Sequence, residues 1–250
     1  MTYDIEKLIN TLMSELHSYH ISVTSEQCSL LLKHLLLVLE KNKEFNLTRI
    51  IDINDGIYKH ILDSLMSLPC ITDFGFAVDN NDISVLDIGS GAGYPGIPIA
   101  LTTQWHVSLI DSSKKKVDAL RQFLQVLRID SCSLYNDRIE LFALNSVYSY
   151  DIVIARAVAE LSILIEYASP LLYHGAYGVF LKGIISNEER QHASYVAKLC
   201  GMQHVTTYNM LLPHNYGQRT IYIYRKYAPS RVTLPRRPGI AHKHPLYSYK

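Results

Sequence analysis

Residues 85–96 read VLDIGSGAGYPG, and this stretch decides the fold. The apolar run at 83–88 that leads into it predicts a buried β-strand, because it is short and is followed by turn residues. Glycines at three alternate positions allow positive φ and let a ligand approach the backbone closely. Pro95 and Pro98 suit the first turn of a following helix, where a missing N–H costs nothing. A strand, a glycine loop and a helix N-terminus in this order predict a nucleotide-type binding site at the carboxyl end of a parallel strand.

The pattern on either side of this stretch predicts an α/β fold preceded by a helical cap. Apolar residues at helical spacing predict helices at about 4–20, 24–42 and 54–68, which we assign to a cap over residues 1–70. An α/β domain over 83–228 and a basic tail over 229–250 follow. The expected strands of this domain are about 83–88, 106–111, 131–135, 150–154, 176–181, 206–212 and 219–227, and its expected helices are about 96–103, 113–128, 160–169 and 187–199. Five βα units that end in a hairpin imply a mostly parallel, doubly wound sheet whose last strand runs antiparallel.

The composition excludes several classes of protein. With 250 residues, of which 48% are hydrophobic and 19% charged, the chain can bury a substantial core as one large domain with a small extension. No apolar run reaches the roughly 20 residues that a membrane span needs. No basic segment followed by an apolar stretch marks a secretory signal at the N-terminus. The four cysteines are scattered, without metal or redox spacing, so free thiols in a reducing cytoplasm are expected.

The formal net charge of +1 hides an asymmetry along the chain. Residues 190–250 contain ten Lys and Arg, no Asp or Glu, and eight of the 18 tyrosines. Cations that contact phosphates and rings that stack on bases are typical of a nucleic-acid surface. A basic edge hairpin that resists aggregation would show the same charge. The tail residues that we expect to contact nucleic acid are Arg231, Arg236, Arg237 and Lys243.

The glycine loop is compatible with two enzyme classes. Its spacing formally matches the G-x-G-x-x-G pattern of dinucleotide-binding proteins, which is weak evidence alone. The longer pattern Asp87-x-Gly89-x-Gly91-x-Gly93 is the arrangement of S-adenosylmethionine enzymes with seven-stranded sheets. A carboxylate at this strand end suits a cofactor with a cationic sulfonium and would repel a pyrophosphate. Asp111, at the end of the next strand, can accept hydrogen bonds from ribose hydroxyls in either class.

The residues that follow the strand at 150–154 bear on the reaction. Methyltransferases that act on amino groups usually place Asn or Asp, two prolines and an aromatic residue here, and carbon-5 pyrimidine enzymes need a nucleophilic cysteine. This chain has Arg156 at the corresponding place. A ring nitrogen such as guanine N7 exposes a lone pair and needs no general base, so methyl transfer requires only in-line placement and suitable electrostatics. Arg156 is therefore the candidate for orienting the substrate or cofactor, and the alternative is a structural ion pair with an acidic neighbour.

These motifs resemble those of a known family, the small-subunit ribosomal RNA guanine-N7 methyltransferases, also called glucose-inhibited division protein B. The resemblance spans roughly residues 40–246, and its landmarks occur in the same order. They are Phe45-Asn46-Leu47-Thr48, Lys59-His60-Ile61-Leu62-Asp63-Ser64-Leu65, the glycine loop with Ile97-Pro98, Asp111-Ser112 with Lys115, Asp137-Arg138-Ile139-Glu140, Ala155-Arg156-Ala157-Val158-Ala159, Leu181-Lys182-Gly183 and Pro235-Arg236-Arg237-Pro238-Gly239-Ile240.

The resemblance implies a Rossmann-like class I methyltransferase with a seven-stranded sheet, an N-terminal helical cap and S-adenosylmethionine as cofactor. The implied substrate is N7 of a guanine in the 530 loop of 16S ribosomal RNA, as free RNA or in the small ribosomal subunit. The family motifs place Gly89 and Tyr94 against the cofactor, Ile139 and Glu140 near its adenine, and Arg156 at the cofactor and substrate side. The full set of expected cofactor-binding residues is Asp87, Gly89, Gly91, Gly93, Tyr94, Asp111, Ile139, Glu140 and Arg156.

Some positions depart from the family pattern or carry a plainer explanation. Ile139 stands where the family usually has Ala or Val, and residues 241–244 replace a segment with a proline and more lysines. Asn46, His60 and Asp63 lie in the cap near the pocket in the family. A lone His or Asp there is more often a packing or capping residue, so we do not assign them to catalysis. The two histidines of 241–244 lack a third ligand, so we expect no metal site and a flexible tail at that segment.

Two other functions remain open at this stage. A dinucleotide-dependent oxidoreductase would use the same glycine loop. A catalytically silent RNA-binding or ribosome assembly factor would keep the fold and bind RNA with a steep salt dependence. For the methyltransferase we expect a cytoplasmic monomer without metal or membrane partner, whose tail packs on or near the active site.

Overall fold

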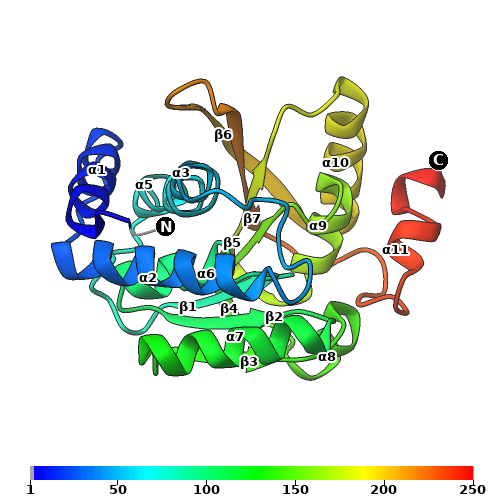
Figure 1. Ribbon diagram of the computed structural model, residues 1–250. Helices are drawn as coiled ribbons and strands as arrows, with labels where there is room; N and C mark the ends of the chain where they lie inside the picture. The colour runs from blue at the N-terminus through cyan, green and yellow to red at the C-terminus, as the bar shows by residue number, and fades with distance from the viewer. Residues whose placement is uncertain (1–2, 250) are drawn as a thin grey trace.

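The computed structural model describes residues 3–249, and its centre is a seven-stranded sheet with helices on both faces (Figure 1). The strand order is β3-β2-β1-β4-β5-β7-β6, and among these strands β7 alone runs antiparallel to its neighbours. The expected sheet, mostly parallel with an antiparallel last strand, is confirmed. The strands are β1 (Ser84–Ile88), β2 (His106–Ile110), β3 (Cys132–Tyr135), β4 (Tyr150–Arg156), β5 (Leu172–Lys182), β6 (Met202–Leu212) and β7 (Gly217–Lys226).

The helices form three groups along the chain. Those of the α/β domain are α6 (Gly96–Thr102), α7 (Lys114–Leu127), α8 (Ile139–Asn145), α9 (Leu161–Ala168) and α10 (Asn187–Leu199). Those before the sheet are α1 (Ile5–Ser18), α2 (Ser25–Lys41), α3 (Ile53–Gly56), the π-helical η1 (Ile57–Leu62), α4 (Asp63–Leu65) and α5 (Ser67–Thr72). The tail carries α11 (Ile240–Lys243) and the 3₁₀ turn η2 (Leu246–Tyr249). In Figure 1, α11 and the cap helix α1 lie on opposite sides of the molecule.

The position of β1 determines where a ligand can bind. Residues 85–88 are buried, as expected for a central parallel strand covered by helices on both faces. β2 and β3 lie on one side of β1, whereas β4 and β5 lie on the other. Ligands of such sheets bind outside the carboxyl ends of the strands, where the chain order reverses. The glycine loop after β1 and the segment after β4 meet at this point.

The cap is joined to the α/β domain by a shared core. α2 begins with a capping box, in which the Thr24 side chain accepts from the Gln27 amide and the Gln27 side chain accepts from the Thr24 amide. Its buried face carries Leu31, Leu35 and Val38 and packs against α6 and α7. One continuous cluster of buried side chains extends from this helix into the sheet. The cap is therefore fixed beside the carboxyl ends of the strands.

Three helical segments differ from the sequence-based expectation. The helix expected at 54–68 continues to residue 72 and contains the π-helical stretch η1, a feature frequent at functional sites. The sequence does not predict α8, because exposed Leu141 and Leu144 obscure its amphipathic pattern. The expectation of a flexible segment at 241–244 is wrong, since most of it lies in the short helix α11.

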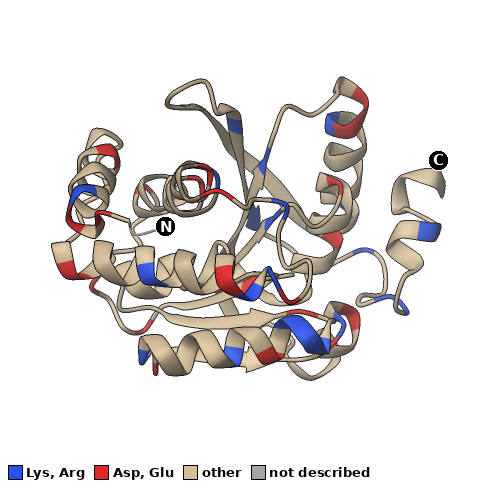
Figure 2. Ribbon diagram, viewed as in Figure 1, with Lys and Arg blue, Asp and Glu red and all other residues tan. Residues whose placement is uncertain are grey.

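Charge is distributed unevenly over these elements. In Figure 2, β7 and the tail carry blue segments without red ones, and β6 carries neither colour, as the sequence of residues 190–250 requires. Within the described residues, no helix is both long and apolar enough to cross a membrane.

Candidate functional site

Two adjoining cavities lie at the carboxyl ends of β1 and β4. The first has a volume of about 310 Å³ and brings together four residues that the sequence assigns to cofactor binding, namely Gly89, Asp111, Ile139 and Glu140. Its other lining residues are Ile88, Ile110, Ser112, Lys116, Asp137, Arg138, Ala157, Val158, Tyr167 and His242. We call this the first cavity.

Gly89 forms the wall of the first cavity where the backbone must come close to a neighbouring segment. Its φ of +69° lies in the left-handed region, and an added Cβ would lie 2.7 Å from Cγ2 of Val158. Only glycine fits this position without strain or a shift of the Val158 side chain. The Gly89 amide donates to the carbonyl of Ile110 at 2.8 Å, which fixes the start of the loop against β2.

Asp111 ties the glycine loop to the next helix. It is buried at the end of β2, where Oδ2 accepts from the Gly91 amide at 3.1 Å and Oδ1 accepts from the Ser113 amide at 2.8 Å. The ammonium of Lys116 lies 3.8 Å from Oδ2. Gly91 therefore contributes to the loop through this hydrogen bond, while the carboxylate of Asp111 reaches the wall of the cavity.

Glu140 connects the first cavity to the C-terminal tail. Its Oε1 accepts from the Gly239 amide at 2.8 Å and from the Tyr167 hydroxyl at 3.3 Å, and its Oε2 lies 3.5 Å from Nε of Arg138. Burial alone would raise the pKa of Glu140, but the hydrogen bond from Gly239 and the charge of Arg138 outweigh it, so the pKa lies below its ordinary value. His242 of α11 also lines the cavity, so the tail forms part of its wall.

Asp87 lies behind the glycine loop, which differs from the expected contact with a cofactor. Its side chain is completely buried, and Oδ2 accepts from the Gly96 amide at 3.0 Å at the start of α6. Burial raises the pKa of Asp87 to about 7. Gly93 likewise faces inward, since an added Cβ would lie 2.6 Å from Ile97. These two residues shape the loop from behind.

The second cavity has a volume of about 350 Å³ and adjoins the first at Ala157, which lines both. Its lining residues come from the cap, from the ends of β4 and β5, and from β7. They are Ile50, Lys59, His60, Asp63, Arg156, Ala157, Leu181, Lys182, Gly183 and Arg219. Ala157 has a φ of +56°, a left-handed conformation uncommon for a residue with a Cβ and typical of functional turns.

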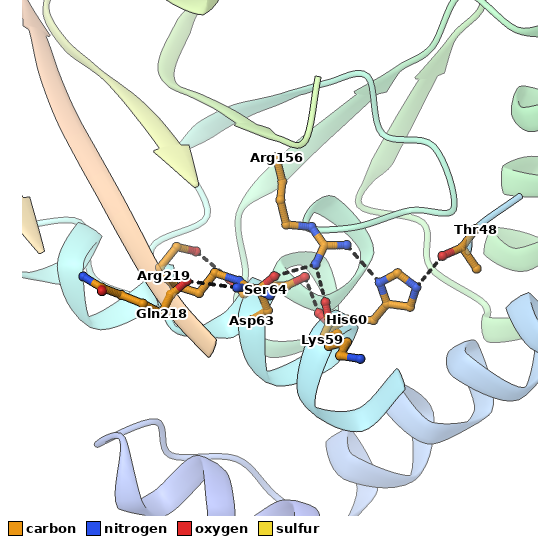
Figure 3. Close-up of polar contacts among 9 residues, drawn as sticks. Thr48, Lys59, His60, Asp63, Ser64, Arg156, Gln218 and Arg219 are labelled. Carbon is orange, nitrogen blue, oxygen red and sulfur yellow. Dashed lines mark hydrogen bonds and ion pairs between the residues drawn. The ribbon is translucent and has the colours of Figure 1, made fainter. Parts of the chain in front are cut away.

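Arg156 is held by three partners from the cap, as Figure 3 shows. Nη1 donates to the Lys59 carbonyl at 2.6 Å and to Oδ2 of Asp63 at 2.9 Å, while Nη2 donates to Nδ1 of His60 at 3.0 Å. On the other side of Asp63, Oδ1 accepts from Nε of Arg219 at 2.8 Å. The acidic partner that the sequence left open for Arg156 is therefore Asp63, which binds two arginines.

His60 is a neutral link in this network. Because Nδ1 accepts from Arg156, the proton must be on Nε2, which donates to the Thr48 hydroxyl at 2.9 Å. Burial, followed by the charge of Arg156, lowers the pKa of His60 to about 2. The ring stacks on Tyr94 with centroids 4.3 Å apart and planes 4° from parallel.

Tyr94 lies beneath the second cavity. Its ring is buried between His60 and His34, and the Arg156 guanidinium lies 5.5 Å from its centroid. Burial raises the pKa of the Tyr94 hydroxyl. The residue expected against the cofactor therefore supports Arg156 and His60 from below.

The arrangement suits positioning better than proton transfer. Both oxygens of Asp63 and both ring nitrogens of His60 are engaged by named partners, and the guanidinium of Arg156 has no acceptor atom. Lys182 donates to the Ala159 carbonyl at 2.8 Å and pairs with Glu189 at 3.0 Å. A substrate atom that carries its own lone pair could react in this cavity without a base from the protein.

The tail residues assigned to RNA contact divide into two groups. Arg236 points inward, where its guanidinium binds both oxygens of buried Glu166 at 2.7 and 2.8 Å and the carbonyl of His244 at 2.8 Å. We therefore remove it from the RNA contacts, because its donors hold the tail to α9. Arg231, Arg237 and Lys243 are exposed.

Sequence reasoning missed most of the second cavity. His60 and Asp63 stand in a quoted family motif but looked like packing residues, and nothing in the sequence pairs Arg219 with them. Across the part of the chain that the structure describes, no cluster of three His, Cys, Asp or Glu side chains could hold a metal ion.

Comparison with known proteins gives consistent relatives. A family model, GidB, described as rRNA small subunit methyltransferase G, matches residues 27–220. A protein of Carboxydothermus hydrogenoformans named ribosomal RNA small subunit methyltransferase G is 32% identical over 245 residues, which cover 97% of this chain and 100% of the relative. A Staphylococcus aureus (strain JH9) protein of the same name is 34% identical over 241 residues, covering 95% of this chain and 98% of the relative.

Solved structures agree on the fold. A putative sarcosine dimethylglycine methyltransferase from Galdieria sulphuraria superposes with a TM-score of 0.53 at 12% identity, covering 70% of this chain and 88% of that one. A SAM-dependent methyltransferase from Methanosarcina mazei gives 0.51 at 14% identity, covering 64% and 97%. At such low identity these two structures bear on the fold alone, and they match the Rossmann-like class I arrangement expected from the sequence.

Proposed function

The chain belongs to the GidB family, rRNA small subunit methyltransferase G, and from this premise we propose that it methylates N7 of a guanine in the 530 loop of 16S ribosomal RNA. Membership of this family establishes that the chain is an S-adenosylmethionine-dependent methyltransferase. The alternative of a dinucleotide-dependent oxidoreductase is thereby removed. The nucleotide, the ring nitrogen and the mechanism are the proposal. The observation that carries them is the second cavity, in which Arg156, Asp63 and His60 are fully engaged with one another.

The residues of the first cavity fit S-adenosylmethionine. Its volume of about 310 Å³ lies within the range of small-molecule sites. The apolar side chains of Ile88, Ile139 and Val158 suit an adenine ring, and the carboxylate of Asp111 can accept from ribose hydroxyls. Because Gly89 has no side chain, its backbone can pack closely against the segment after β4 and also lie beside the ligand. When bound, the cofactor supplies an electrophilic methyl group.

The second cavity would hold the target base next to that donor. Ala157 lines both cavities, so a base held beside Arg156 adjoins a ligand held beside Gly89. Guanine N7 presents a lone pair and carries no proton, so the protein needs to position the base and does not need to deprotonate it. Asp63 and His60 keep the Arg156 guanidinium in one orientation for this purpose. The reaction would be a direct displacement without a covalent enzyme intermediate.

The exposed cations of the tail would contact the RNA backbone. Arg231, Arg237 and Lys243 are exposed, and the tail that carries them lines the first cavity through His242. Guanine N7 faces the deep, narrow major groove of an A-form helix, so a loop or splayed base is the accessible target. Such a substrate brings phosphates close to the site, where basic side chains add affinity that falls with salt.

A labelling experiment tests the proposal. The purified protein is incubated with methyl-labelled S-adenosylmethionine and with small subunits, naked 16S RNA or assembly intermediates, all from a strain that lacks the enzyme. We expect label at one guanine of the 530 loop, and chain cleavage specific for 7-methylguanine at that nucleotide. Label at another nucleotide, or at another atom of the same guanine, would overturn the proposal. No incorporation into any of the three substrates would favour a catalytically silent RNA-binding factor.

A further inference from the structure

Two isoleucines next in sequence to residues that line the second cavity have their side chains in solvent. Ile51 is 80% exposed and Ile184 is 77% exposed, the two highest values among the exposed large hydrophobic side chains of the described residues. Each directly follows a residue that lines the cavity, Ile50 in the first case and Gly183 in the second. A single exposed apolar residue needs no explanation. Here two of them, 133 positions apart in the sequence, each follow a residue that lines the same cavity, and this arrangement needs one.

Both side chains are held in exposed positions by anchored segments. Ile53 is 4% exposed and Ile185 is 6% exposed, so each exposed isoleucine has a buried isoleucine within two residues. The loop before Ile51 is fixed further by Asn42, whose side-chain oxygen accepts from two backbone amides of that loop at 2.7 and 2.9 Å. Turning either isoleucine inward would therefore displace an apolar side chain from the core. The backbone conformation of these segments therefore keeps both side chains exposed.

The second cavity is cationic. Lys59, Arg156, Lys182 and Arg219 line it together with one carboxylate, that of Asp63. Outside the lining, Lys59 pairs with Asp55 and Lys182 pairs with Glu189. The four cations and three carboxylates together leave a net charge of +1. A positive cavity with an apolar rim matches a nucleic acid, which offers phosphates and the apolar faces of its bases.

We propose that Ile51 and Ile184 pack against the bases on either side of the target nucleotide when that nucleotide is turned into the second cavity. The inference rests on the proposed function and adds the RNA contacts that hold the strand open. A base removed from its stack leaves the faces of its neighbours exposed, and apolar side chains inserted at that position cover them. The isoleucines thus contribute to RNA affinity and offset part of the free-energy cost of extrusion, while Arg156 acts on the extruded base.

The test uses serine variants of the full chain. Ile51→Ser and Ile184→Ser should each raise the KM for RNA about fivefold, and the double variant about 25-fold, because each removes one contact with a base. The kcat at saturating RNA should stay within about twofold, and calorimetry should give an unchanged S-adenosylmethionine affinity. Leu144→Ser is the matched control, because Leu144 is 59% exposed on α8 and does not line either cavity. Ile184→Phe should keep the KM or lower it, since an aromatic ring stacks better on a base.

The outcomes separate this inference from the proposed function. If the wild type methylates the 530 loop and the double variant keeps its KM, the inference is wrong and the proposed function stands. If the wild type methylates none of the substrates, RNA binding is measured directly by fluorescence anisotropy. An RNA affinity that the double serine variant leaves unchanged would then refute the inference as well. An equal rise in KM for Leu144→Ser would also refute it, because the effect would not depend on the cavity.

Discussion

Replacing Asp63 by asparagine would remove the negative charge that binds Arg156 and Arg219 in the second cavity. The carboxylate is 5% exposed, and each oxygen accepts from a different arginine, Arg156 at 2.9 Å and Arg219 at 2.8 Å. Removing one partner of a buried ion pair costs about 3–5 kcal/mol, because the remaining charge is left without compensation. Asparagine keeps one acceptor oxygen for one of the arginines. We therefore expect a loss of about 3 kcal/mol in the free energy of unfolding.

Urea denaturation measures this loss, and a second Asp–Arg pair provides the control. Asp118 pairs with Arg121 at 2.6 Å on α7, with side chains 47% and 55% exposed. Asp118→Asn changes the net charge by the same amount, yet an exposed pair contributes less than about 1 kcal/mol. The activity of the two variants should differ too. In Asp63→Asn, Arg156 loses the negative charge of one of its three partners from the cap. A displacement of about 1 Å at a reacting group lowers kcat by about a hundredfold.

A double variant shows whether the uncompensated charge is the cause. In the Asp63→Asn background, Arg219→Gln removes one of the two stranded guanidiniums and should recover about 1 kcal/mol or more of the lost stability. The same Arg219→Gln change in the wild type should destabilise the protein. The reasoning fails if Asp63→Asn and Asp118→Asn cost the same within 0.5 kcal/mol, or if Arg219→Gln lowers stability equally in both backgrounds.

Three further predictions concern the cavities. Arg156→Lys keeps the positive charge but loses the planar guanidinium, so we expect kcat to fall about a hundredfold. The affinity for S-adenosylmethionine, measured by calorimetry, should stay within about threefold of wild type. A large loss of cofactor affinity would mean that Arg156 binds the cofactor and not the substrate. Gly89→Ala places a Cβ 2.7 Å from Val158 at a φ of +69°, which should cost about 1–2 kcal/mol of stability in thermal melts and lower cofactor affinity at least tenfold, whereas unchanged values would mean that the loop can shift. The pKa of His60 is lowered to about 2, so the unfolded chain takes up the proton first and stability should fall as pH drops below 6.5, by about 2 kcal/mol at pH 5. Urea unfolding at pH 7.5 and pH 5 should show a smaller loss in the free energy of unfolding for His60→Asn, whose side chain cannot be protonated. An identical loss in both proteins would mean that another group causes the pH dependence.

Much of the fold follows from local patterns. The apolar run at 83–88, the glycine spacing and the capping box at Thr24 each have a direct physical meaning, and the structure agrees with all three. The prediction fails where local patterns are weak. α8 is short and exposes Leu141 and Leu144, and α11 is a single turn after Gly239, whose φ is +78°. Helices of this length are stabilised mainly by tertiary packing, which a local sequence pattern does not show.

The site could be predicted only where it follows the strands. Gly89 and Asp111 come directly after β1 and β2, so strand prediction alone puts them at one edge of the sheet. Asp63, Arg156 and Arg219 come from three separate elements, 93 and 156 positions apart along the chain from Asp63. Their meeting depends on the angle at which the cap packs and on the register of β7, and neither is encoded in a local pattern. The same holds for Glu140 and Gly239, since the path of the tail decides that contact.

The segment after β4 explains why the two cavities adjoin. Arg156 lines the second cavity, Ala157 lines both, and Val158 lines the first. Successive side chains of a regular strand point to opposite faces of the sheet, so a strand alone would not distribute three neighbours in this way. The left-handed conformation of Ala157 ends the strand pattern at this point and turns the chain from one cavity to the other. Arg156, which we propose positions the acceptor, and Val158, which packs against Gly89, are therefore two positions apart on one turn. A shift of β4 by a single residue would misplace both together.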